Sequence, residues 1–275
     1  MSYPFKQYTN EELIREFNTL KNSNFNTLSP CSRLGKKCSN AFFQYERMNT
    51  ARNGKLSNIE FYEKHKDKVM KYHNNDPHAT TLFRSIHFLN KPPSQFSITQ
   101  TCSLFHRFQV KSIFDPFAGW GDRLVGALAT NIDYVGCDTN THLIQPYKNL
   151  ISFYKHQSKV EIIFKPAQEV IKSLNHDFDM MLSSPPFFYK TGKCVEHYFK
   201  QERDYDKFLT ECLVPVVMFG LKHCKITALH LPEHMFDDII KCGVRKCDEV
   251  VPYGSKRNFD VNNKSKQALI YLWKR

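Results

Sequence analysis

Residues 111–123, KSIFDPFAGWGDR, constrain the fold more than any other stretch of the chain. An apolar lead typical of a β-strand ends at Asp115, a turn with glycines at 119 and 121 follows, and a helix-like run begins at Leu124. A helix that starts directly after such a turn presents free backbone N–H groups at its positive end, and glycine lets a ligand approach the backbone closely. The stretch therefore predicts the strand–turn–helix unit with which an α/β sheet holds a nucleotide-like cofactor.

Strand-like and helix-like segments alternate from this turn to the end of the sequence. The expected strands are residues 111–115, 132–137, 160–164, 178–183, 225–231, 245–252 and 267–273. The expected helices between them are residues 122–130, 141–155, 167–174, 204–220 and 233–242. Such alternation predicts a mostly parallel sheet with helices on both faces. The last two strands have no helix between them, so we expect them to form an antiparallel hairpin at one edge.

The N-terminal part of the chain has a different pattern. Its helix-like segments, which lack the alternation typical of strands, are residues 9–20, 40–53, 58–73 and 76–90. The character changes at Pro92-Pro93. This change predicts a basic helical extension over residues 1–91 and a main domain over residues 92–275.

The formal net charge is +12, and the excess is concentrated near the N-terminus. Residues 1–100 hold 15 Lys and Arg against 8 Asp and Glu, a difference of +7, whereas residues 101–275 hold 24 against 19, a difference of +5. A basic surface favours a polyanionic partner, most often nucleic acid, although solvated lysines are the competing interpretation. Phe42 and Phe43 lie beside Arg47 and could stack on bases, but anchoring a small helical layer is the favoured interpretation.

Cysteine usage and hydropathy disfavour several classes of protein. The nine cysteines are scattered without a CxxC pair, which favours reduced thiols over disulfides or a zinc site. No stretch approaches the ~18 consecutive apolar residues of a membrane span, and the amphipathic N-terminus lacks an apolar signal-peptide core. We therefore expect a soluble, intracellular protein that uses neither a metal nor a membrane.

A second acidic position, Asp138, closes the segment YVGCD, 17 residues after Gly121. A carboxylate at the tip of the neighbouring strand can bind the two hydroxyls of a ribose whose other end rests on the first turn. The turn itself reads G-W-G-D-R. This is neither the GxGxxG of dinucleotide-binding dehydrogenases nor the GxxxxGK[ST] of P-loop proteins, so both classes are disfavoured.

The sequence Ser-Ser-Pro-Pro-Phe-Phe, residues 183–188, follows the fourth expected strand at an edge where α/β sheets place ligands. Two consecutive prolines fix the backbone and remove two hydrogen-bond donors. The Pro185 carbonyl and the Ser184 side chain are then acceptors at fixed positions, which suits an exocyclic –NH₂ group whose lone pair must face an electrophile. Phe187 offers a face on which a base taken out of its stack can lie.

Together, DPFAGWG, the acidic Asp138 and SPPF resemble the S-adenosyl-L-methionine-dependent amino-methyltransferases. These are the DNA N6-adenine and N4-cytosine enzymes and their RNA-acting relatives, whose motifs read D-P-F-x-G-x-G and [DNS]-P-P-[YFW]. The resemblance covers residues 92–275 and is strongest to the virus and phage type. It implies a Rossmann-like class I methyltransferase fold, α/β, with a seven-stranded mostly parallel sheet, helices on both faces and an N-terminal helical extension. It also implies a location in the cytoplasm, the nucleus or a viral replication site.

The resemblance assigns roles to individual residues. It implies that S-adenosyl-L-methionine is held by Asp115, Pro116, Phe117, Ala118, Gly119, Trp120, Gly121, Asp138 and Gln168. It implies that the catalytic turn consists of Ser184, Pro185, Pro186 and Phe187. The sulfonium supplies the electrophile, so no metal is implied. The implied reaction is methyl transfer to N6 of adenine or N4 of cytosine, with DNA favoured over RNA as the nucleic-acid partner.

Departures from the family pattern leave alternatives open. Ser184 stands where adenine-specific enzymes most often have Asp or Asn; serine is more usual in N4-cytosine enzymes and is a weaker acceptor. The 69 positions from Asp115 to Ser184 leave no room for a recognition domain, so recognition is expected from residues 1–91, from the basic and aromatic loop 187–203 or from a partner. The alternatives are an RNA amino-methyltransferase, a protein-glutamine methyltransferase, which Ser184 and the basic charge disfavour, and an inactive relative that binds cofactor or nucleic acid.

Overall fold

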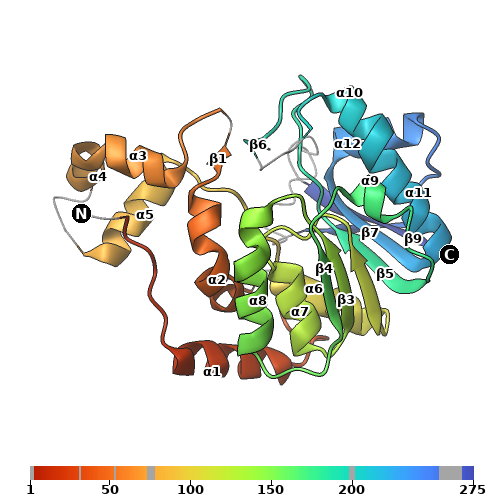
Figure 1. Cartoon of the computed structure of the whole chain (residues 1–275), viewed down its shortest axis with the longest axis horizontal. Coiled ribbons are helices and arrows are strands. Elements are labelled where there is room, and N and C mark those ends of the chain that lie inside the picture. The colour runs from red at the N-terminus through yellow and green to blue at the C-terminus, as the bar shows by residue number, and fades with distance from the viewer. Residues whose placement is uncertain (1–2, 31, 53, 73–77, 198–201, 254–267) are drawn as a thin grey trace.

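The computed structural model describes residues 3–30, 32–52, 54–72, 78–197, 202–253 and 268–275. Its centre is a seven-stranded sheet in the order β4-β3-β2-β5-β7-β9-β8 (Figure 1). The strands are β2 Ser112–Asp115, β3 Asp133–Cys137, β4 Val160–Ile163, β5 Phe178–Ser183, β7 Cys224–Pro232, β8 Glu249–Pro252 and β9 Ala268–Lys274. The first five are parallel, whereas β9 runs antiparallel between β7 and β8. The sheet confirms the expected Rossmann-like class I methyltransferase fold, with the closing hairpin at one edge.

Helices cover both faces of the sheet, and each face has its own hydrophobic core. One core includes side chains of α6 Ile98–Arg107, α7 Asp122–Ala129 and α8 Ile144–Phe153, which follows a 3₁₀ turn Thr141–Leu143. The other includes side chains of α9 Ala167–Val170, α11 Val214–His223 and α12 Glu233–Lys241. Consecutive β2 residues belong to different cores, Ile113 to the first and Phe114 to the second. This alternation is what a strand buried on both faces requires.

The segment expected as one helix over residues 204–220 is interrupted. It consists of α10 Tyr205–Lys207, a π-helical turn Phe208–Leu213 and then α11. Pro215 lies in the first turn of α11 and has no backbone N–H, so the regular hydrogen-bond ladder cannot run through this point. A single widened turn is a common response to such an interruption, and it is often found beside functional sites.

The first two helices of the extension pack directly on the sheet domain. Helices α1 Asn10–Lys21 and α2 Lys36–Met48 contribute Phe17 and Phe43 to the same core as α6, α7 and α8. Phe43 is fully buried, and its ring centroid lies 4.8 Å from that of Tyr147 in α8. Phe42 packs 5.6 Å from Phe153. Both phenylalanines are therefore core anchors, as expected, but they anchor α2 to the core of the sheet domain and not a separate helical layer.

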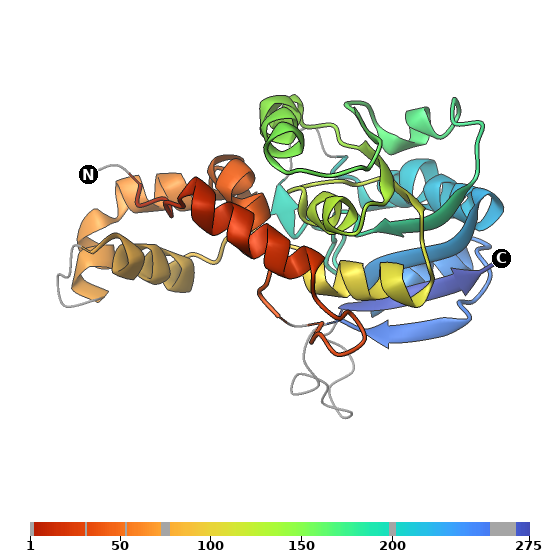
Figure 2. The same ribbon diagram turned by 90° about the horizontal axis from the view of Figure 1, so that it is seen from below.

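The other three helices of the extension form a separate layer. They are α3 Asn58–Lys64, α4 Lys66–Tyr72 and α5 Ala79–Leu89, so the single helix expected over residues 58–73 breaks at His65. Their buried side chains make a small core of their own, joined by Tyr3 and Met48. Figures 1 and 2 show this layer standing to one side of the sheet domain.

A short antiparallel pair links the extension to the loop that follows the fourth expected strand. The helix expected over residues 40–53 ends at Met48, and β1 Ala51–Arg52 then pairs with β6 Glu196–His197. The two segments that the sequence predicts to serve recognition are thus connected; residues 198–201 of the loop lie outside the described residues. Within the described ranges, no helix is long and apolar enough to cross a membrane.

Candidate active site

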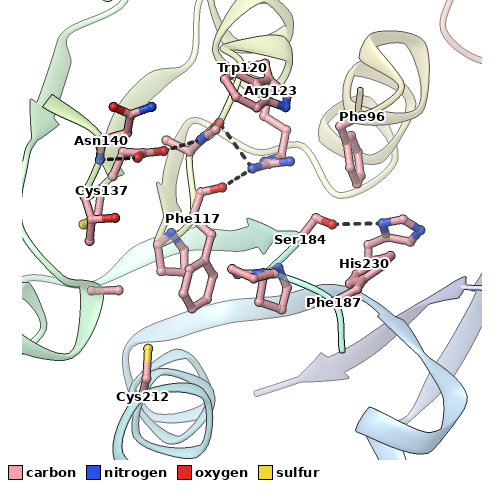
Figure 3. Close-up of a pocket in the computed structure, with 18 of the residues that line it drawn as sticks. Phe96, Phe117, Trp120, Arg123, Cys137, Asn140, Ser184, Phe187, Cys212 and His230 are labelled. Atoms are coloured by element: carbon pink, nitrogen blue, oxygen red, sulfur yellow. Dashed lines mark hydrogen bonds between the residues drawn. The ribbon is translucent and has the colours of Figure 1, made fainter. Parts of the chain in front are cut away.

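The carboxyl ends of β2, β3, β5 and β7 surround a cavity of about 430 Å³, drawn in Figure 3. The strand order reverses between β2 and β5, and ligands of open α/β sheets bind in the crevice at such a point. Of the residues predicted for the site, those that line the cavity are Pro116, Phe117, Ala118, Gly119, Trp120, Asp138, Gln168, Ser184, Pro185, Pro186 and Phe187. The two that do not line it are Asp115 and Gly121.

Hydrogen bonds from neighbouring elements hold the turn after β2. The Ala118 N–H donates to the Cys137 carbonyl over 2.8 Å, and the Tyr147 hydroxyl donates to the Gly119 carbonyl over 2.8 Å. Gly119 has a φ of 60°, in the left-handed region that favours glycine. Trp120 is only 7% exposed; it packs into the core and also lines the cavity. Neighbouring elements therefore hold the turn through hydrogen bonds and packing.

Asp115 lies behind this turn and has no exposed surface. Its Oδ2 accepts hydrogen bonds from Arg123 Nε at 2.7 Å and from the Tyr134 hydroxyl at 2.6 Å. Its Oδ1 accepts one from Ser183 Oγ at 2.6 Å. Arg123 also donates to the Phe117 carbonyl. In this structure Asp115 shapes the turn through a buried ion pair with Arg123 and does not face the cavity.

Asp138 faces the cavity from the end of β3. Its Oδ2 accepts the Gly119 N–H at 2.8 Å and its Oδ1 accepts the Asn140 N–H at 2.8 Å. Burial raises the pKa of Asp138 to about 6, and these two N–H donors only partly oppose that rise. Each carboxylate oxygen has a further lone pair. Asp138 can therefore accept ribose hydroxyls while it continues to hold the glycine turn.

The proline turn after β5 brings Ser184 beside a histidine that the sequence did not single out. Ser184 Oγ lies 3.0 Å from Nδ1 of His230, and Figure 3 shows the two side chains facing one another. Phe187 meets the same imidazole edge to face, with the ring centroids 5.2 Å apart. His230 also lines the cavity. The signal for it was weak. His230 is one of three polar residues in the segment KITALHL, and the sequence alone does not show which strand lies beside this one.

Asp122, the first residue of α7, was also missed. It is 2% exposed, and burial raises its pKa. It accepts hydrogen bonds from Ser39 Oγ at 2.5 Å, from the Phe96 N–H at 3.1 Å and from Gln95 Nε2 at 3.2 Å. Gln95 and Phe96 line the cavity. Asp122 thus fixes the segment before α6 as one wall of the site, and Ser39 connects this wall to α2.

The described residues contain no group of three or more His, Cys, Asp or Glu side chains placed to hold a metal ion. The cysteines in the described ranges are free thiols. The polar groups of the cavity are the carboxylates of Asp122, Asp138 and Glu202, amides, hydroxyls, an imidazole, the Lys165 amine and the paired guanidinium of Arg123. This donor and acceptor set suits an organic ligand with both polar and apolar parts.

No protein-family model matches the chain, and no curated protein matches it. Among solved structures, the chain is similar to TrmN from Thermus thermophilus, with 12% identity and a TM-score of 0.45 over 66% of this chain and 49% of that one. It is similar to an rRNA methylase from Streptococcus thermophilus, with 10% identity and a TM-score of 0.41 over 62% and 95% of the two chains. It is similar to a SAM-dependent methyltransferase from Agrobacterium tumefaciens, with 13% identity and a TM-score of 0.41 over 66% of each chain. The chain thus spans about half the length of TrmN. The fold class of the chain follows from the strand order of its own sheet.

Proposed function

We propose that this chain is an S-adenosyl-L-methionine-dependent methyltransferase that methylates the exocyclic amino group of adenine or cytosine in DNA. One observation carries the proposal. A single cavity joins the glycine turn and Asp138, which suit a nucleoside cofactor, to the Ser184–Phe187 turn, which suits an amine. A donor and an acceptor of a methyl group can face one another there without movement of the sheet.

The residues of the cavity fit the cofactor. Asp138 offers carboxylate oxygens to the ribose, and the glycine turn allows close approach of the backbone. Gln168 at the start of α9 offers an amide to the adenine edge, between apolar surfaces that include Pro166 and Cys212. A volume of about 430 Å³ lies within the range of small-molecule sites. When bound, the sulfonium supplies an activated methyl group.

The protein's part in the reaction is positioning. Ser184 and the Pro185 carbonyl accept the two hydrogens of the target amine, which turns the nitrogen lone pair toward the methyl group. Phe187 stacks on the base, and the buried wall of Asp122 and Phe96 keeps water away. Holding two reactants in line supplies a large part of the rate in reactions of this kind.

A basic surface beside the turn supports nucleic acid as the polymer. Lys190, Lys193 and Arg203 line a second, open hollow with Gly54 of the extension. Asp204 and Asp206 also line it, which leaves an excess of one positive charge. Both lysines are exposed and follow the Ser184–Phe187 turn within nine residues. Cations at this place can hold the phosphates that flank a base extruded into the cavity.

The direct test is nucleoside analysis. The purified protein is incubated with S-adenosyl-L-methionine and with unmethylated DNA or RNA, and the digested polymer is separated by liquid chromatography and mass spectrometry. We expect N6-methyladenine or N4-methylcytosine in DNA. Ser184→Ala should lower the turnover number about 10²-fold or more, because one preorganised hydrogen bond to the reacting group is lost. The dissociation constant of the cofactor should not change.

Ser103→Ala is the matched control, because Ser103 is a half-buried serine whose hydroxyl donates to the Phe25 carbonyl away from the cavity. It should leave turnover unchanged. Methylated nucleosides in RNA alone would move the proposal to an RNA substrate. Cofactor binding without any methylated nucleoside would identify an inactive relative and overturn the proposed activity.

A further inference from the structure

Ser184 and His230 follow paired positions on neighbouring strands. In the β5–β7 pair, Ser183 stands opposite Leu229, so the next residue of each strand lies at the same level at the cavity wall. The 3.0 Å between Ser184 Oγ and His230 Nδ1 is a hydrogen-bond distance. The sheet itself therefore sets this contact, and no loop has to close to form it.

His230 is enclosed by aromatic rings. It is 7% exposed, and the ring centroids of Phe96, Phe187 and Tyr253 lie 5.5, 5.2 and 3.9 Å from its own. Within the described part of the chain, no hydrogen-bond partner is found for Nε2. Burial lowers the pKa of His230 to about 3, so the ring is neutral at physiological pH. His230 is thus connected to the reacting groups in the cavity through its polar contact with Ser184.

Given the function proposed above, we propose that His230 Nδ1 accepts the hydroxyl hydrogen of Ser184 and that this pair takes up the proton of the target amine. A serine hydroxyl alone can donate as well as accept. With its hydrogen held by His230, the serine oxygen presents only lone pairs to the cavity. Ser184 and His230 together then do what one carboxylate does at this position: they accept a hydrogen bond and receive a proton.

Because the Ser184 oxygen can only accept hydrogen bonds from the base, it also determines which bases can bind. Adenine N6 and cytosine N4 donate hydrogens, whereas the carbonyl oxygens of guanine and thymine at the equivalent positions accept them. A serine oxygen that can only accept leaves those carbonyls unpaired, which strongly disfavours their binding in a buried site. His230 acts through Ser184 and is therefore a positioning residue.

The step balances in atoms and charge. The target nitrogen forms a bond to the methyl carbon, the carbon–sulfur bond breaks, and its electron pair stays on sulfur. The nitrogen loses a proton to Ser184 Oγ as the serine hydrogen moves to His230 Nδ1. The positive charge of the sulfonium therefore ends on the imidazolium. The electron-poor ring of adenine or cytosine makes its positively charged, methylated amino nitrogen a strong acid, so this nitrogen gives up its proton even to a buried imidazole. The proton then returns through Ser184 to water that enters the cavity once the products have left.

The tautomer of His230 can be measured without turnover. We expect ¹⁵N NMR of the labelled, full-length protein to show a neutral His230 ring with the hydrogen on Nε2 and a bare, hydrogen-bonded Nδ1. Ser184→Ala should shift the Nδ1 signal and leave the other histidines unchanged. A hydrogen on Nδ1 in the wild-type protein would overturn the proposal, because His230 would then donate to Ser184. This result does not depend on whether any nucleic acid is methylated.

Turnover by variants tests the proton step. His230→Phe should lower the turnover number about 10²-fold or more, the range for loss of an acid–base group. His230→Asn can place an acceptor oxygen near Nδ1 but cannot take a proton, so its loss should be smaller, about tenfold. Ser184→Asp in the His230→Phe background should recover at least about tenfold, because a carboxylate combines both tasks. Cofactor affinity should stay within about twofold in all three variants, since the change is made on the amine side.

His223→Phe is the matched control, because His223 ends α11 and lies 3.1 Å from Asp177, away from the cavity. It should leave turnover unchanged. Failure of Ser184→Asp to restore His230→Phe, in a protein that still binds cofactor, would assign His230 a packing role and overturn the proposal. Absence of methylated nucleosides in the wild-type protein would instead contradict the proposed function, and the tautomer measurement still decides the Ser184–His230 contact.

Discussion

At the scale of single residues, the ionisation of Asp138 should control cofactor affinity. The surrounding protein keeps water from the half-buried carboxylate and raises the pKa of Asp138 to about 6. Ribose hydroxyls donate to the ionised carboxylate, so ligand binding favours the deprotonated form. The dissociation constant of S-adenosyl-L-methionine should be constant above neutral pH, rise as pH falls through 6, and be about tenfold larger one unit below the pKa. Isothermal titration calorimetry across this range measures it.

A control variant is necessary because the buried carboxylate of Asp122 also lines the cavity and its pKa is also raised. Asp138→Asn should bind the cofactor weakly at every pH and show a flat profile. If the pH dependence survives in Asp138→Asn, the titrating group is another one, and Asp138 is not the ribose acceptor.

The residues themselves show how far a sequence can predict a site. Ser184 and Asp138 follow strands, and parallel strands that end at one sheet edge bring such positions together whatever the loops do. Asp115 is the last residue of β2 and lies level with Gly136 of β3, two residues before Asp138. There Arg123 and Tyr134 bind it in a buried network that spacing does not reveal. His230 required knowledge that β7 pairs with β5.

At the scale of elements, the turn before α7 depends on a helix of the extension. Gly121 has a φ of 71°, and a Cβ added there would come within 2.6 Å of the Phe43 ring in α2. Gly121→Ala therefore combines a left-handed backbone with a steric clash, and should lower the free energy of unfolding by about 2 to 4 kcal/mol. Chemical denaturation measures this change, and weaker cofactor binding should accompany it.

Gly243→Ala separates the two causes. Gly243 has a φ of 93°, but nothing lies within 4 Å of an added Cβ, so this variant should cost only about 1 kcal/mol from backbone strain. In a Phe43→Leu background the cost of Gly121→Ala should fall by about 1 kcal/mol, as expected for a contacting pair. Equal costs at the two glycines would contradict a role for Phe43 in shaping the cofactor turn.

Elements with strong periodicity could be predicted, and those set by tertiary contacts could not. The seven strands of the main sheet begin and end within one residue of the expected positions, except that β8 begins four residues later, because each is an apolar run between turn residues. The pairing of β1 with β6 joins two-residue strands far apart in the sequence, which leave no local pattern. The π-helical turn before α11 follows from Pro215, whose local effect the helical periodicity hides.

At the scale of the whole molecule, packing divides the extension in two. Helices α1 and α2 share the core of the sheet domain, whereas α3, α4 and α5 enclose a core of their own. The ends of this second layer meet: Asn58 Nδ2 donates to the Asn90 carbonyl over 2.6 Å, and Asn90 Nδ2 donates to the Leu56 carbonyl over 2.9 Å. The chain therefore enters and leaves this layer at neighbouring points. The division between the two cores falls inside the extension and not at Pro92, where the composition of the sequence changes.

This division predicts opposite outcomes for two deletions. Removal of residues 1–91 strips Leu13, Phe17 and Phe43 from the main core, and at about 1.5–3 kcal/mol for each large apolar side chain the loss approaches the stability of a typical domain. We expect the protein that lacks residues 1–91 not to fold cooperatively. Replacement of residues 57–90 by a short glycine–serine linker exposes Tyr3 and Met48 but keeps the main core, so it should melt cooperatively and bind the cofactor within a few-fold of the wild-type affinity. Circular dichroism melts and calorimetry compare the two, and a chain starting at residue 92 that melts like the wild type would show that α1 and α2 do not stabilise the fold.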